Sequence, residues 1–178
     1  MKAVPPAGLS QAAAKKPASQ SNVASQKGQF EKIECEDFAG RNYQLPDSGA
    51  SGEMYASRAS KSGSILTATN ALFKYPVPDG LGEAAVWIRV RNFEGTIELR
   101  DRKVGEEAVA GEKIVSWKLS KRINVADTAG KWNWVNLGSH DLSSIEFIVP
   151  YISRSCPEDA GLDCIILTSD LTFEPKSQ

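Results

Sequence analysis

The chain from Phe30 onward is built from short runs in which apolar and polar residues alternate, most clearly at 85–91 and 145–149. Side chains of an extended strand point alternately to its two faces, so each run predicts a strand with one buried face. Turn-forming residues separate the runs, as at 76–80 and 128–130, and no segment keeps a helical period. The pattern predicts an all-β fold, an antiparallel β-sandwich of the jelly-roll type.

The expected strands lie near 31–38, 71–77, 84–92, 95–100, 113–118, 132–138, 143–150, 162–168 and 171–174. Residues 39–64 are rich in Gly and Ser and are expected to form a long irregular loop, a kind of segment that often carries function. Residues 1–29 hold almost no large apolar side chains, which predicts a flexible low-complexity tail or linker. The remainder, 30–178, is expected to form one domain.

Composition excludes several classes of protein. A chain of 178 residues with 41% hydrophobic side chains is long enough for one domain with a proper core. The net charge is −1 and the two signs are interspersed, so no basic face is expected for a nucleic acid. No apolar run approaches the roughly 18–20 residues that cross a bilayer, and the N-terminus lacks the apolar segment of a secretion signal. We therefore expect no membrane span.

Three cysteines and one histidine constrain disulfides and metals. Cys156 and Cys164 flank a short segment and can close it in an oxidising compartment, whereas Cys35 is expected to point into the core. The odd count leaves the pairing open. Zinc is not expected, because the cysteines are scattered and no CxxC spacing occurs.

No constellation for catalysis is present, so the chain is not expected to be an enzyme. Ser139, His140 and Asp141 are consecutive, whereas the members of a catalytic triad converge from separate segments. The sequence also lacks a GxSxG elbow, an HExxH zinc motif and a glycine-rich phosphate loop.

Three carboxylates stand in segments that are otherwise apolar. Glu34 and Glu36 alternate at the start of the domain, and Asp163 interrupts the apolar run 162–167 near its end. Acids in such strands cost free energy unless something pairs them. We expect Glu34 and Glu36 to share one face of the first strand, about 7 Å apart, and the first and last strands to meet around a cation with oxygen ligands. The alternative is a solvent-facing edge strand that carries two acids.

Four segments in this order resemble the galactose-binding-like jelly roll of carbohydrate-binding modules of families 6 and 35. They are IECEDF (33–38), VWIRVR (86–91), KWNWV (131–135) and LDCIIL (162–167), and the resemblance covers about residues 31–175. It implies a structural calcium held by Glu34, Glu36 and Asp163. It also implies a non-catalytic module that binds polysaccharide outside the cell or at its surface, beside a companion enzyme domain.

The resemblance further implies that Trp132 stacks on a sugar in a cleft at the loop end of the sandwich, while Trp134 belongs to the core. A flat indole suits the C–H face of a sugar ring. Two buried core tryptophans are the alternative. Tyr55, in the predicted long loop, is the expected second wall of the cleft.

One position departs from the resembling modules. Many family 6 modules have an asparagine two residues before the closing aspartate, and this chain has Gly161 there. Arg58, Arg154 and Asp159 are the candidates to supply the missing polar contact to the ligand. The departure keeps a second hypothesis open, namely a structural or assembly component of a surface layer, filament or virion that uses the same jelly roll without binding sugar and its tail as a tether.

Overall fold

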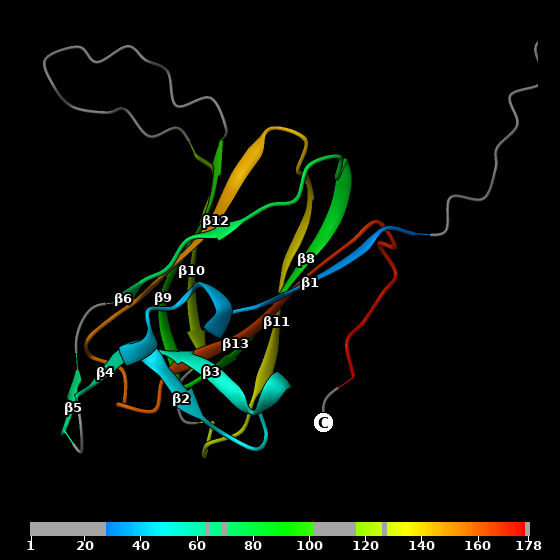
Figure 1. The fold of residues 1–178 in the computed structure, drawn as a ribbon. Helices are drawn as coiled ribbons and strands as arrows, with labels where there is room; N and C mark the ends of the chain where they lie inside the picture. The colour runs from blue at the N-terminus through cyan, green and yellow to red at the C-terminus, as the bar shows by residue number, and fades with distance from the viewer. Residues whose placement is uncertain (1–27, 63–64, 69–70, 102–116, 126–127, 177–178) are drawn as a thin grey trace, which may run out of the picture.

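The structure is a computed structural model, and it describes residues 28–62, 65–68, 71–101, 117–125 and 128–176 (Figure 1). Two antiparallel sheets pack face to face, so the predicted all-β sandwich is confirmed. The predicted tail lies outside the described residues, except for Gly28 and Gln29. No helix within the described segments is long and apolar enough to span a membrane.

The first sheet is called the β8 sheet here. Its strands follow the order β11 (Asn133–Asp141), β8 (Glu83–Arg91), β13 (Gly161–Thr168), β3 (Met54–Ser57) and β2 (Gln44–Pro46). Strand β1 (Phe30–Glu34) also belongs to this sheet and pairs with β13. The second sheet is called the β9 sheet. Its strands follow the order β10 (Trp117–Val125), β9 (Phe93–Asp101), β12 (Ile145–Ile152) and β6 (Ala71–Leu72), and β7 (Tyr75–Pro76) is a further strand that pairs with β12. A small hairpin joins β4 (Ala59–Ser62) to β5 (Ile65–Ala68), and three 3-10 turns are η1 (Glu36–Phe38), η2 (Arg41–Tyr43) and η3 (Ser51–Glu53).

The core lies between the two sheets. Ile88 of β8, Leu99 of β9 and Ile148 of β12 are fully buried members of one continuous apolar cluster. Burying a side chain of this size stabilises the fold by about 1.5–3 kcal/mol relative to leaving it in water. The apolar residues of the alternating runs in the sequence therefore include the side chains that face the core between the two sheets.

Strand β13 lies at the centre of the β8 sheet, and all of its residues are buried. One of its edges pairs with β8, and the other pairs first with β3 at Gly161 and Leu162 and then with β1 from Cys164 onward. Figure 1 shows β1 and β13 running side by side. The prediction that the first and last strands lie together is therefore confirmed.

Asp163 occupies the point at which β13 changes partner. Leu162 lies opposite Val90 and Ile165 lies opposite Ile88, so Asp163 and Cys164 together face the single residue Arg89. This is a β-bulge, which places one extra residue in a strand and redirects the side chains around it. Leu162 and Ile165 can therefore both enter the core cluster, and Asp163 is left to meet Arg89.

Several predicted boundaries were wrong. The first strand ends at Glu34, because Cys35 takes a helical backbone conformation (φ −71°, ψ −30°) and Glu36 begins η1. The predicted loop 39–64 contains β2, β3 and β4, short strands whose Gly- and Ser-rich sequence hides the alternation. Residues 171–174 form no strand, since Phe173 N–H donates to the Asp170 carbonyl in a turn. Of the strand expected at 113–118, residues 113–116 lie outside the described residues.

The three cysteines are free and buried. Cys35 belongs to the core cluster, as expected. The Cys156–Cys164 disulfide, one of the pairings that the sequence left open, is not formed. The Cys156 thiol donates to the Glu94 carbonyl at 3.2 Å, while Cys164 lies beside Asp163.

Candidate functional site

Glu34, Asp163 and Cys164 form an acidic cluster at the junction of β1 and β13. Each contributes one potential ligand atom, and these atoms lie within 4.8 Å of one another. The arrangement follows from strand pairing, because Glu34 is directly opposite Cys164 and the Cys35 N–H donates to the Asp163 carbonyl at 2.8 Å.

Asp163 is fully buried and its two carboxylate oxygens have protein partners. Arg89 Nη1 donates to Oδ2 at 2.7 Å, and the backbone N–H of Ser51 donates to Oδ1 at 2.7 Å. Burial nevertheless raises the pKa of the Asp163 carboxyl, although Ser51 and Arg89 oppose that shift and the charge of Glu34 adds to it. An internal ion pair thus compensates part of the negative charge of the cluster.

The two glutamates are less completely paired. Glu34 Oε1 accepts from Ser51 Oγ at 3.0 Å and pairs with Lys32 Nζ at 2.7 Å. Glu34 Oε2 and Glu36 Oε2 are buried atoms without a protein hydrogen bond. A buried acceptor left without a donor costs about 1–3 kcal/mol, and more when it is charged.

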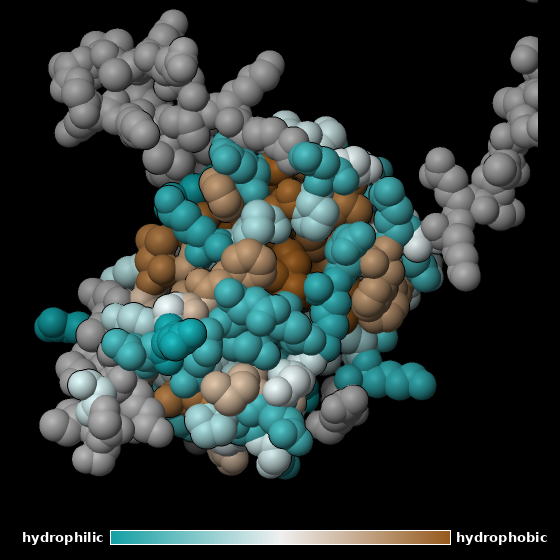
Figure 2. Space-filling model, in the orientation of Figure 1, coloured by the Kyte–Doolittle hydropathy of each residue, from teal (hydrophilic) through white to brown (hydrophobic). Residues whose placement is uncertain are grey.

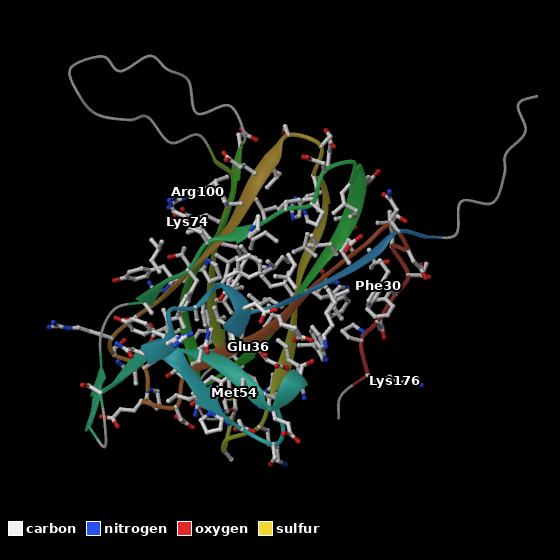
Figure 3. The ribbon with its side chains drawn as sticks, in the orientation of Figure 1. Phe30, Glu36, Met54, Lys74, Arg100 and Lys176 are labelled. Carbon is white, nitrogen blue, oxygen red and sulfur yellow. The ribbon has the colours of Figure 1, made fainter. Side chains whose placement is uncertain are left out.

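Glu36 lies beside the acidic cluster and carries the clearest electrostatic strain in this region. Burial, followed by the charges of Glu34, Asp163 and Asp37, raises the pKa of its carboxyl to about 7. The side chain stands in η1 (labelled in Figure 3), next to Gly52, where an added Cβ would lie 3.1 Å from Glu36 Oε1. The expectation that Glu34 and Glu36 share one strand face was wrong, because the strand ends between them.

The donor set fits a hard cation at the glutamate side of the cluster. Two buried carboxylate oxygens lack partners there, and a cation such as calcium takes oxygen ligands from carboxylates and carbonyls. Cys164 contributes a sulfur, which calcium does not favour. The oxygens of Glu34 and Asp163 are therefore the candidate ligands within the cluster, and Glu36 lies beside it, outside the group whose ligand atoms come within 4.8 Å of one another.

A second cluster gathers around Tyr55 and Trp132. Their rings meet edge to face with centroids 5.4 Å apart. The guanidinium carbon of Arg91 lies 4.7 Å from the centre of the Tyr55 ring and 4.6 Å from that of Trp132, and Arg91 also forms an ion pair with Asp47. Tyr55 is 3% exposed, whereas Trp132 is only half-buried. Trp132 is therefore the ring that reaches solvent, and Tyr55 and Arg91 support it.

Gly161 explains how Tyr55 becomes buried. A Cβ at position 161 would lie 2.6 Å from Cε2 of Tyr55 and 2.8 Å from the Ala56 carbonyl oxygen. The tyrosine ring thus fills the space in which a longer side chain at 161 would stand. The absence of an asparagine at position 161 and the burial of Tyr55 therefore go together, because the two side chains would occupy the same space.

The remaining predicted contact residues belong to the loop 153–160 or to its support. Arg58 is buried and its Nε donates to the Pro157 carbonyl at 2.8 Å, so it fixes the loop from inside. The Asp159 side chain is 47% exposed and accepts from Asn92 Nδ2 at 3.0 Å. Arg154 is exposed on the same loop. Asp159 and Arg154 are the two that a ligand beside the loop can reach.

Residues 47–53 connect the two clusters. Asp47 and Ala50 contact the aromatic cluster, and Ser51 and Gly52 border the acidic one. Sequence reasoning placed this segment in the long loop 39–64 without singling out its residues, and it missed the arginines of β8, Arg89 and Arg91. A signal for the arginines existed, because both occupy alternate positions of a strand that is otherwise apolar.

Trp134 is not a core residue, contrary to what the resemblance implies. It pairs with Arg89 across β11 and β8, and its indole N–H donates to the Lys176 carbonyl at 3.3 Å. The guanidinium carbon of Arg89 lies 5.9 Å from the ring centres of both Trp132 and Trp134. Both indoles therefore lie near Arg89, outside the core cluster.

No protein-family model matches the chain, and no curated protein matches it. Solved structures of similar fold include the C-terminal family 6 carbohydrate-binding module of a marine laminarinase from Zobellia galactanivorans, with 18% identity over 79% of this chain and all of that chain and a TM-score of 0.47. A family 29 carbohydrate-binding module from Piromyces equi has 13% identity, covers 80% of this chain and 91% of its own, and has a TM-score of 0.41.

A third similar structure is the K1 cleaved adhesin domain of Lys-gingipain from Porphyromonas gingivalis. It has 12% identity and a TM-score of 0.41, and the match covers 80% of this chain and 93% of that one. At these identities the function of this chain has to be argued from its own residues.

Gly161→Ala should destabilise the protein by about 1–3 kcal/mol, because the new methyl group overpacks the Tyr55 ring and the Ala56 carbonyl. Urea denaturation measures the change. Gly82→Ala is the matched control, since nothing lies within 4 Å of its added Cβ. Equal midpoints for the two variants would contradict the tight packing of Tyr55 against Gly161.

The metal-free protein should lose stability as the pH rises from about 5 to about 8. The pKa of Glu36 is about 7 in the folded protein, whereas its ordinary value, taken for the unfolded chain, is 4.5. Between these two values the folded state binds more protons than the unfolded state, so stability falls as the pH rises. Denaturation midpoints in the presence of a chelator measure the effect. Glu36→Gln should flatten the pH dependence, and Glu31→Gln, an exposed neighbour, should keep it.

Proposed function

We propose that this chain is a non-catalytic carbohydrate-binding module that binds polysaccharide by stacking a sugar ring on Trp132. The observation that carries the proposal is the half-buried indole of Trp132, which contacts both Arg91 and the Tyr55 ring at the loop end of the β8 sheet. The order of the sequence segments around it resembles such modules. A location outside the cell or at its surface, beside a companion enzyme domain, is part of the proposal.

The support beneath Trp132 favours binding over a purely structural role. Arg91 is buried between the two rings, and its charge is compensated by Asp47 and Asp159. The indole is therefore fixed before any ligand arrives, which lowers the entropy lost on binding. A rigid aromatic surface suits a sugar ring, whose C–H groups pack on it while its hydroxyl groups remain in water.

Polar contacts to the ligand are assigned to the rim of this surface. Asp159 and Arg154 lie on the exposed loop 153–160 and provide an acceptor and a donor. Tyr55 and Arg58, which are buried, act from behind, Tyr55 by holding Trp132 and Arg58 by holding the loop. The ligand thus meets one aromatic face and a polar rim rather than two aromatic walls.

The acidic cluster is proposed as the structural calcium site of this module, with Glu34, Glu36 and Asp163 as ligands. Its support is the pair of buried glutamate oxygens without protein partners and the raised pKa of Glu36. A divalent cation would neutralise these charges and fasten β1 to β13. The residues provide the binding and the charge balance, and no reaction is involved.

Trp132→Ala should strongly weaken retention on an insoluble polysaccharide or a glycan array. The reason is that removal of the stacking face takes away the central contact of the site, typically worth more than 1 kcal/mol at such positions. Phe30→Ala, which removes an exposed aromatic of β1, is the control for nonspecific adhesion. Equal retention of wild type and Trp132→Ala would remove Trp132 from the site.

Calcium should raise the melting temperature of chelator-treated protein. A ligand that binds only the folded state stabilises it by about 2.7 kcal/mol at a concentration 100 times its Kd. The double variant with Glu34→Gln and Glu36→Gln should melt at the same temperature with and without calcium, whereas Glu31→Gln should respond like the wild type. A wild-type melting temperature that calcium leaves unchanged would contradict the metal assignment.

A further inference from the structure

A second surface, built around Phe38, lies apart from the aromatic cluster and shares Glu34 with the acidic cluster. Phe38 ends the η1 turn and is 46% exposed. It lines two hollows, one of about 460 Å³ with Tyr43, Leu72 and Lys74, and one of about 340 Å³ with Asp37 and Pro76. Because both hollows share the same ring, they are neighbouring parts of one surface, called the Phe38 surface here.

The apolar groups of this surface are unusually open. Leu72, on the edge strand β6, is 50% exposed and lines the larger hollow together with Phe38. In the view of Figure 2, brown apolar side chains show between teal polar ones on the face that carries β6 and the turn after β1. Phe30, another exposed aromatic, packs edge to face on Phe173 with ring centroids 5.5 Å apart and lines neither of the two hollows. Open apolar groups that gather in a hollow mark a binding surface more often than scattered ones do.

Phe38 is held in place from below. Its ring meets Tyr75 edge to face at 5.9 Å, and Tyr75 is fully buried and stacked on Phe73. The backbone of its turn is fastened by Gln44, whose side-chain amide donates to the carbonyls of Glu36 and Ala39 at 2.8 and 2.9 Å. The exposed ring is therefore a fixed platform, and little conformational entropy is lost when a ligand covers it.

The lining of the Phe38 surface discriminates between occupants. An added peptide strand is disfavoured, because Lys74 and Pro76 stand on this edge of the β9 sheet and such residues protect edges from pairing (Lys74 is labelled in Figure 3). Two ammonium groups, Lys32 and Lys74, are balanced by the carboxylates of Glu34 and Asp37. The lining charges therefore sum to zero, which favours a neutral ligand that has both apolar faces and hydroxyl groups.

We propose that the Phe38 surface is a second saccharide-binding site, which takes an extended neutral oligosaccharide with one sugar ring stacked on Phe38 and its neighbours in the two hollows. The total volume suits a ligand of more than one sugar ring, since binding pockets for small molecules measure about 300–1,000 Å³. This inference rests on the proposed carbohydrate-binding function and adds to it, because two separate sites on one module bind a polysaccharide chain with avidity.

The test is retention of four proteins on arrayed laminarin, xylan and cello-oligosaccharides, with polygalacturonate and alginate as acidic probes. The proteins are the wild type, Trp132→Ala, Phe38→Ala and the double variant. Phe38→Ala should weaken binding to at least one neutral glycan about tenfold, the change that corresponds to about 1.4 kcal/mol. The double variant should bind that glycan more weakly than either single variant.

Leu72→Arg provides an independent check on the same array. It fills the larger hollow from an exposed position and leaves the core contact of Phe38 with Tyr75 intact. It should reproduce the loss seen with Phe38→Ala, while Leu171→Ala, an equally exposed leucine elsewhere, should not. Melting curves of all variants show whether the fold is kept.

The possible outcomes separate the two sites. If Phe38→Ala and Leu72→Arg bind every glycan like the wild type, the inference is overturned, and loss of binding by Trp132→Ala alone would still support the first site. If only the Phe38 variants lose binding, the second site stands and the assignment of Trp132 fails. Dependence on Phe38 confined to the acidic probes would overturn the choice of a neutral ligand.

Discussion

Asp163 is buried at the point where the central strand β13 exchanges β3 for β1 as its neighbour. An ionised carboxylate in such a place is tolerated only when it is paired, and Arg89 and the backbone of Ser51 supply the partners. The same bulge that frees Asp163 from the core lets Leu162 and Ile165 both enter it. The buried Asp163 carboxylate therefore joins Arg89 of β8 to the loop 47–53.

That loop gives the two clusters a common support. At one end Asp47 neutralises Arg91, which carries the rings of Tyr55 and Trp132, and at the other end Ser51 bonds Asp163 and Glu34. Charge is thus balanced internally on both sides of the loop. The exceptions are the buried Oε2 atoms of Glu34 and Glu36, which is why the proposed cation is placed on that side.

The candidate site was only partly predictable. The sequence singled out Glu34 and Asp163, because acids in apolar strands are visible in the pattern, and it singled out Trp132 through the resemblance to carbohydrate-binding modules. It placed Glu36 on the same strand face as Glu34, whereas Glu36 begins the η1 turn. It also predicted Tyr55 as an exposed wall of the sugar cleft, whereas its ring is buried against Gly161. The Phe38 surface was not predicted, since an exposed phenylalanine after a strand has the same sequence pattern as a buried one.

The alternation of residue types by itself indicated that this chain forms a β-sandwich, and it located the long strands around Ile88 and Ile148 that contribute to its core. That information is local, because a two-residue period assigns each side chain to a face. Tertiary structure alone decided the register and the partners: that two residues of β13 oppose Arg89, that β1 replaces β3 beside it, and that Arg91 stands between Tyr55 and Trp132. These contacts join residues far apart in the chain, and their energies depend on burial and charge that exist only after the sheets have packed.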